Sequence, residues 1–166
     1  MQYGIGVEYG LHCLLYLVDR PKGDALGIKE MAKFQGVSET YLSKIFTKLR
    51  KHGIVQSAPG VKGGYELAKD PKDISFWDVI EAIEGASYNF QCKSILQNII
   101  INKEDHPTDE HGSCVCNIKY VMYEAEDRMR DFLRSKSLRW LQKDVAKVTT
   151  EAYKTEEKQW FEQAKK

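Results

Sequence analysis

Residues 28–55 read IKEMAKFQGVSETYLSKIFTKLRKHGIV, and this stretch decides the fold. Apolar residues recur at helical spacing before Gly36 and again after Ser38, which predicts two helices joined by a sharp turn. Gly36 can adopt the positive φ of a helix end, and Ser38 can cap the amide groups of the second helix. The spacing from Ala32 through Gly36 to Ile45 is typical of a helix-turn-helix.

The second of these helices carries the side chains that we expect to contact double-stranded DNA. The hydroxyl groups of its first turn can meet base edges in a major groove, and the lysines that follow can neutralise phosphates. The expected DNA-binding residues are Ser38, Glu39, Thr40, Tyr41, Lys44, Lys48 and Lys51, with Arg50 as a further cation. A solvated basic face on an ordinary helical hairpin is the alternative interpretation.

Residues 53–67, GIVQSAPGVKGGYEL, predict a β-hairpin wing behind the helix-turn-helix. Two short β-prone runs flank a turn rich in Gly and Pro. Lys62 at the tip can reach a phosphate or the minor groove. Gly63 and Gly64 permit close approach to the DNA backbone, or they serve only the turn.

Flanking segments complete a mainly α-helical fold with this small β-hairpin wing. An amphipathic helix begins near Val7 and ends before Pro21. A second helix follows Ser75, which forms a plausible capping pair with Asp78, and ends at Gly85.

A long helix from Asn117 carries an apolar stripe that a single winged helix has no core to receive. The stripe consists of Ile118, Val121, Met122, Ala125, Met129, Phe132 and Leu133. We expect it to pack against a second copy of the chain, the alternative being a helix folded back on its own domain. The expected organisation is a winged helix-turn-helix domain at 1–85, a cysteine-bearing sensor loop at 86–116, a dimerisation helix at 117–134 and a C-terminal helical extension at 135–166.

The overall charge conceals a basic segment. The chain has 166 residues with 25 Lys or Arg and 24 Asp or Glu, a net charge of +1, yet residues 29–72 hold nine basic and four acidic side chains. This local excess is compatible with a nucleic-acid partner. No apolar run is long enough for a membrane span, no signal peptide is evident and the four cysteines do not form a disulfide framework, so we expect a cytoplasmic protein.

Residues 36–55 together with the wing at 60–67 strongly resemble the Rrf2 family of bacterial winged-helix regulators, which includes the iron-sulfur regulator IscR and the nitric oxide sensor NsrR. The resemblance covers roughly residues 5–134. It implies a transcriptional regulator that binds a palindromic operator as a homodimer, and we expect this regulator to be a repressor. No nucleophile-base set or phosphate loop points to an enzyme.

The interval at 86–116 contains soft ligands suited to a sensing site, namely Cys92, His106, His111, Cys114 and Cys116. Thiolates bind iron-sulfur clusters and zinc. Family members that bind a cluster usually carry three cysteines here. Cys92 and Cys116 match the first and the last, whereas Cys114 stands closer to the last than the middle cysteine normally does.

Some cluster-binding relatives complete the site with an acidic residue and a histidine from the first helix of the partner subunit, and Glu8 and His12 match those positions. The resemblance therefore implies a 2Fe-2S cluster between subunits, held by Glu8 and His12 of one chain and Cys114 and Cys116 of the other, with Cys92 in reserve. Such a cluster would sense redox state, nitric oxide or iron-sulfur status. A solvated surface pair is the alternative for Glu8 and His12.

The sensor loop and the winged helix each have other interpretations. Zinc held by His106 or His111 with Cys114 and Cys116 is one, and a metal-free thiol switch is another. A winged helix that binds only protein is the alternative of a different class. Cys13 lies on the apolar face of the first helix and is expected in the core.

Overall fold

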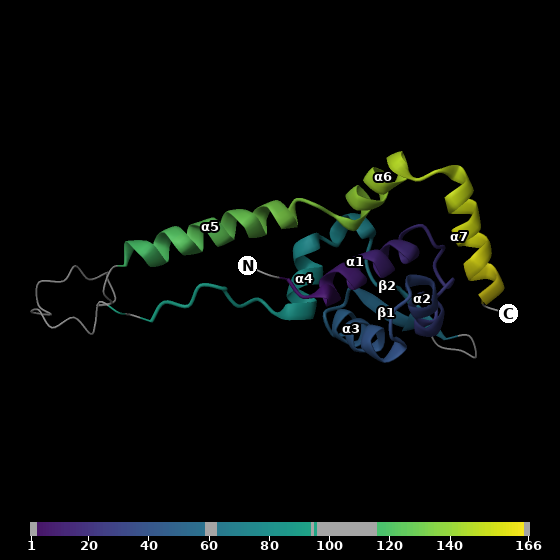
Figure 1. Cartoon of the computed structure of the whole chain (residues 1–166), viewed down its shortest axis with the longest axis horizontal. Helices are drawn as coiled ribbons and strands as arrows, with labels where there is room; N and C mark the ends of the chain where they lie inside the picture. Colours follow the sequence, from purple (N-terminus) through teal and green to yellow (C-terminus); the bar gives the residue numbers. More distant parts are fainter. Residues whose placement is uncertain (1–2, 59–62, 94, 96–115, 165–166) are drawn as a thin grey trace, which may run out of the picture. The chain divides into compact units, whose positions relative to one another are not determined.

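The computed structural model describes residues 3–58, 63–93, 95 and 116–164 (Figure 1). Its chain forms two compact units. One consists of Gln2–Ala86 with Leu133–Lys166, and the other of Ser87–Phe132. None of the described helices is long and apolar enough to cross a membrane.

The larger unit contains the predicted winged helix-turn-helix. Its elements are α1 (Ile5–Val18), α2 (Ile28–Gln35), α3 (Glu39–Lys51), β1 (Val55–Ala58), β2 (Gly64–Leu67), the 3-10 turn η1 (Pro71–Asp73) and α4 (Phe76–Glu84). β1 and β2 form an antiparallel hairpin in which Val55 pairs with Leu67 and Ala58 with Gly64. The predicted fold, mainly α with a small hairpin, is confirmed.

The turn between α2 and α3 has the predicted local chemistry. Gly36 ends α2 with a φ of 71°, in the left-handed region that favours glycine. The Ser38 hydroxyl then accepts a hydrogen bond from the Tyr41 amide and caps α3. Leu42 and Phe46 are fully buried, so the apolar face of α3 lies in the core. These contacts hold α3 with its polar face toward solvent.

Gly64 serves a contact inside the protein. The backbone of Tyr65 exchanges two hydrogen bonds with Leu26, of 3.0 and 2.8 Å, which ties the hairpin to the segment before α2. A Cβ atom on Gly64 would lie 2.4 Å from the Leu26 carbonyl oxygen. Glycine is therefore required here because the chain's own backbone passes so closely.

Helix α4 is capped at its start and packs closely on α1 near its end. Ser75 and Asp78 form the predicted capping box at its start. A Cβ on Gly10 of α1 would lie 2.8 Å from the Ile83 side chain, so the small residue allows α1 and α4 to pack closely. The buried faces of both helices, with Leu14, Val79 and Ile80, are part of the core.

The C-terminal helices α6 (Leu138–Val148) and α7 (Glu151–Ala164) pack onto this same unit (Figure 1). Leu138 is fully buried, and its amide donates a 2.8 Å hydrogen bond to the Ile74 carbonyl. Phe161 is 1% exposed, with its ring 4.8 Å from that of Phe34 and 5.3 Å from that of Tyr16. The C-terminal helices thus belong to the same unit as the winged helix.

The smaller unit contains most of α5 (Asn117–Arg134), one side of which is covered by residues 88–90. Arg130 and Glu126 are buried and form an ion pair of 2.7 Å. The Asn89 amide donates to Glu126, and the Arg130 guanidinium lies 4.0 Å from the centre of the Tyr88 ring. This polar cluster holds the chain against α5.

Candidate nucleic-acid interface and sensor residues

The first turn of α3 presents polar groups to solvent. Ser38, Glu39 and Thr40 are exposed. Tyr41 is 39% exposed, because one edge of its ring packs against Tyr9 of α1 at a centroid distance of 6.0 Å. The turn can therefore offer hydroxyl and carboxylate groups to base edges, from a position fixed by its packing on α1.

The later turns of α3 carry exposed cations. Lys44, Arg50 and Lys51 are exposed, and none of them forms an ion pair with a residue that the structure describes. Uncompensated cations beside an exposed polar turn are an arrangement suited to the phosphates that flank a major groove.

Lys48 stands apart from these cations. Its ammonium group donates a 2.6 Å hydrogen bond to the Ile83 carbonyl oxygen at the end of α4. The last carbonyls of a helix have no partner within it, so a lysine at this end is favourable. Lys48 thus joins α3 to α4, a contact that sequence spacing did not indicate. Lys62, expected at the tip of the wing, lies outside the described residues.

Glu8 and His12 lie on α1, and both are exposed on the same face. His12 also lines a pocket between α1, α6 and α7. The two side chains belong to the larger unit.

The described cysteines differ in burial, and Cys13 lies in the core as the sequence predicts. This thiol is fully buried, burial raises its pKa to about 12, and its assignment to the core is confirmed. Cys92 and Cys116 are half-buried and belong to the smaller unit. His106, His111 and Cys114 lie outside the described residues.

The proposed cluster ligands do not come together within the described part of one chain. Over residues 3–58, 63–93, 95 and 116–164, no three His, Cys, Asp or Glu side chains converge on a point that could hold a metal ion. Thiolate, imidazole and carboxylate are nevertheless the donor types that iron-sulfur clusters accept.

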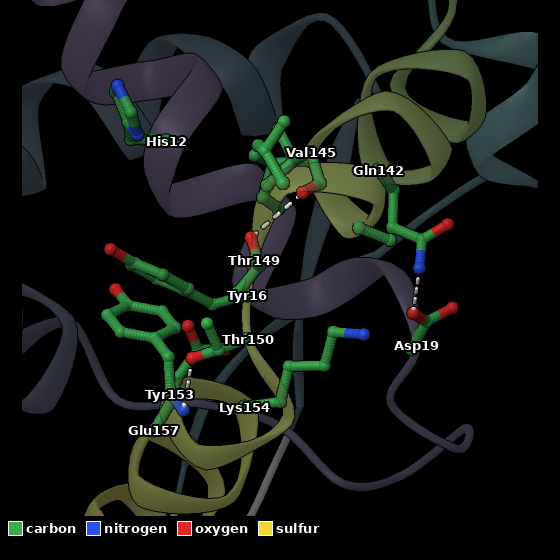
Figure 2. Close-up of a pocket in the computed structure, with 13 residues that line it drawn as sticks. His12, Tyr16, Asp19, Gln142, Val145, Thr149, Thr150, Tyr153, Lys154 and Glu157 are labelled. Atoms are coloured by element: carbon green, nitrogen blue, oxygen red, sulfur yellow. Dashed lines mark hydrogen bonds between the residues drawn. The ribbon is translucent and has the colours of Figure 1, made fainter.

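The sequence did not predict the pocket between α1, α6 and α7, which has a volume of about 650 Å³ (Figure 2). Tyr16 and Tyr153 lie beside one another in it, with Glu157 next to them. The spacing of Tyr153 and Glu157, one helical turn apart, was the available signal. It could not reveal that α7 packs against α1.

Comparison with known proteins gives a consistent result. A family model described as "Rrf2: Iron-dependent Transcriptional regulator" matches residues 4–144. A putative HTH-type transcriptional regulator, YwgB, of Bacillus subtilis is 30% identical over 148 residues, which cover 89% of this chain and 88% of that protein. The HTH-type transcriptional regulator NsrR of Shouchella clausii is 29% identical over 129 residues, covering 75% of this chain and 77% of that one.

A solved structure supports the same fold. The structure of IscR of T. potens superposes with a TM-score of 0.65 at 25% sequence identity, covering 90% of this chain and 92% of that chain. The similarity therefore extends well beyond the helix-turn-helix.

Proposed function

Because the chain belongs to the Rrf2 family of transcriptional regulators, we propose that it binds double-stranded DNA as a homodimer and inserts α3 of each copy into a major groove. The family match covers residues 4–144 and places the chain among regulators, which are not enzymes. Two-fold symmetry of the protein matches a palindromic operator with two half-sites.

The observation that carries this proposal is the exposed face of α3. Its first turn offers Ser38, Glu39 and Thr40, and the following turns offer Lys44 and Lys51 without an acidic partner among the described residues. The buried opposite face and the Ser38 cap hold these groups in place. A purely protein-binding winged helix does not require unpaired cations at this helix.

The apolar stripe of α5 supports the homodimer. Ile118, Val121 and Phe132 are 69%, 65% and 61% exposed. These side chains lie on one face at helical spacing, opposite in character to the buried Glu126–Arg130 face. A large exposed apolar face is typical of an interface, and a second copy supplies a matching stripe.

DNA binding can be tested without knowing the operator. Duplexes selected from a random pool by the purified protein provide the probe, and fluorescence anisotropy measures the affinity. We expect Lys44→Glu and Lys51→Glu each to weaken binding at least tenfold, whereas Lys158→Glu, the same change on an exposed position of α7, leaves it unaltered. Equal affinities for all three variants and the wild type would overturn the proposal.

We propose further that a 2Fe-2S cluster bridges the two subunits, held by Glu8 and His12 of one chain and by Cys114 and Cys116 of the other, with Cys92 in reserve. Three observations support this: the exposed Glu8–His12 pair, the half-buried Cys116 thiol directly before α5, and the family description as iron-dependent. When bound, the cluster supplies a one-electron redox centre that responds to oxidants and nitric oxide. The protein's part is to offer mixed ligands from two chains, so that assembly of the site depends on how the dimer is arranged.

Anaerobic purification tests the cluster directly. We expect a visible spectrum typical of an iron-sulfur cluster, with iron and sulfide in equal amounts, and its loss in Cys116→Ala and His12→Ala. Cys13→Ala is the control, because that buried thiol faces the core and the variant should keep the colour. Stoichiometric zinc would contradict the cluster and indicate a zinc site. A colourless protein without metal after reconstitution would contradict the cluster and indicate a thiol switch.

A further inference from the structure

The pocket between α1, α6 and α7 is lined by both apolar and polar side chains (Figure 2). Its apolar lining includes Leu15 of α1 and Val145 and Ala146 of α6. Tyr16 of α1 and Tyr153 of α7 lie beside one another in it, with Glu157 of α7 next to them. A volume of about 650 Å³ is in the usual range for sites that bind small organic molecules.

The charged groups around the pocket differ in whether they already have partners. Asp19 pairs with Arg139 at 2.7 Å and accepts a hydrogen bond from Gln142, and Lys154 pairs with Glu151 at 2.6 Å. Near Glu157, Arg20 pairs with Asp24 at 2.7 Å. Most of the charge of the pocket rim is therefore neutralised locally.

Glu157 is the exception. Its side chain is half-buried and forms no hydrogen bond or ion pair with a residue that the structure describes. Burial raises the pKa of its carboxyl group, and Arg20 offsets this only in part. A carboxylate removed from water without a close partner is costly for the free protein, and a bound cation would remove that cost.

We propose that this pocket binds a small organic cation with an apolar body, whose ammonium group pairs with Glu157 beside the rings of Tyr16 and Tyr153 and whose body lies on Leu15, Val145 and Ala146. Aromatic faces attract ammonium groups, and the attraction strengthens where water is excluded. An anion would meet the carboxylate of Glu157, and the nearby Arg20 and Lys154 already pair with Asp24 and Glu151. A neutral ligand would leave the charge of Glu157 uncompensated.

Most residues that line the pocket lie C-terminal to the segment that the family model matches. The family match ends at residue 144, and eight lining residues follow it: Val145, Ala146, Val148, Thr149, Thr150, Tyr153, Lys154 and Glu157. Phe161 docks α7 on α1 and α2, so the C-terminal segment closes the pocket against the helix-turn-helix unit. The proposal depends neither on the DNA contacts nor on the cluster.

Isothermal titration calorimetry on the full chain, with three probes of matched shape, tests the proposal. The probes are 2-phenylethylamine, which is cationic at neutral pH, 2-phenylethanol, which is neutral, and phenylacetate, which is anionic. We expect the amine to bind at least tenfold more tightly than the alcohol, and phenylacetate to bind more weakly than both. Equal affinities for the three probes, or no binding of the amine, would refute the proposal.

Variants locate the binding event. Glu157→Gln keeps the shape of the side chain and should weaken amine binding at least tenfold while leaving alcohol binding unchanged. Glu156→Gln removes the same charge from the adjacent, exposed position and should bind the amine as the wild type does. A thermal melt of each variant verifies folding. Undiminished amine binding by folded Glu157→Gln would show that the cation binds elsewhere and would overturn the assignment.

Discussion

The ammonium group of Lys48 donates a hydrogen bond of 2.6 Å to the carbonyl oxygen of Ile83, which joins the recognition helix α3 to the end of α4. Lys44, one turn earlier on α3, is exposed and has no such contact. Two lysines on one helix thus have different environments. One contributes to the fixed orientation of α3, and the other is available to a ligand.

This difference predicts that matched substitutions of the two lysines affect different properties, stability for Lys48 and DNA binding for Lys44. Lys48→Met should lower the free energy of unfolding by about 1 kcal/mol, because a charge-assisted hydrogen bond is lost. Lys44→Met should change it by less than about 0.5 kcal/mol and instead weaken DNA binding. Urea denaturation measures the first effect, and the salt dependence of DNA affinity measures the second, with a slope reduced by about one for each copy. Equal destabilisation by both variants would contradict the structural role of Lys48.

The capping box of α4 gives a second prediction. The Ser75 hydroxyl accepts a hydrogen bond from the Asp78 amide at 3.1 Å, and the Asp78 carboxylate accepts one from the Ser75 amide at 2.7 Å. Ser75→Ala should therefore destabilise the protein by about 1 kcal/mol in urea denaturation. Ser57→Ala, at an exposed position of β1, is the control and should change stability little. The reverse order of the two effects would contradict the assignment.

What the sequence could predict here was local in the chain. The turn at Gly36, the Ser38 cap and the Ser75–Asp78 capping box depend on residues a few positions apart, and all were predicted. The burial of Cys13 followed from its place on the apolar face of α1. Helix periods and caps are determined by short-range chemistry.

What the sequence could not predict depends on residues that meet only after folding. Lys48 reaches Ile83 across 35 positions, and Gly64 is needed because Leu26 passes against it. The pocket at Glu157 exists because Phe161 docks α7 on α1. No spacing rule connects such positions, so the sequence did not distinguish Lys48 from the other cations of α3.

The exposed stripe of α5 predicts which substitution separates the proposed dimer. Val121→Glu places a charge in the apolar face and should weaken the dimer by about 100-fold, because two charges would lose water at the interface. Tyr120→Glu puts the same charge on an exposed position of the same helix, about 200° around its axis from Ile118, and should leave the dimer intact. Light scattering across a dilution series measures both. A dimer that tolerates Val121→Glu would exclude this face.

The smaller unit offers two Glu–Arg pairs of the same spacing in different surroundings. Glu126 and Arg130 are buried, whereas Glu124 and Arg128 are exposed. Burial raises the pKa of Glu126, but hydrogen bonds from Arg130 and Asn89 outweigh it, and the net shift is downward. Its stabilising contribution is therefore present above the pKa of the unfolded chain and is lost as the pH falls through the lower folded value.

Glu126→Gln should destabilise this unit by about 3 kcal/mol at neutral pH, because the Arg130 charge stays buried without its partner. Hydrogen exchange at the Asn89 amide, which donates to Glu126, should accelerate accordingly. Glu124→Gln breaks the exposed pair and should alter exchange at Asn89 little. If both variants left that amide equally protected, the buried pair would have no such role.

The raised pKa of Glu157 gives a prediction about stability as well as binding. Tyr16 of α1, Arg20 in the segment after α1 and Tyr153 of α7 interact with this carboxylate, and His12, Asp19 and Lys154 line the same pocket. Burial is the main cause of the shift, and Arg20 opposes it.

A group whose pKa is raised on folding favours the folded state below its unfolded pKa, and that contribution is lost as the pH rises through the folded value. Glu157→Gln should therefore raise the melting temperature at pH 7.5 by roughly 1–3 °C and have a smaller effect at pH 4, because protonation removes the charge that burial opposes. Glu156→Gln should show neither change, because that side chain is exposed. A gain at pH 4 as large as the gain at pH 7.5 would mean that the charge of Glu157 is not what the pocket opposes.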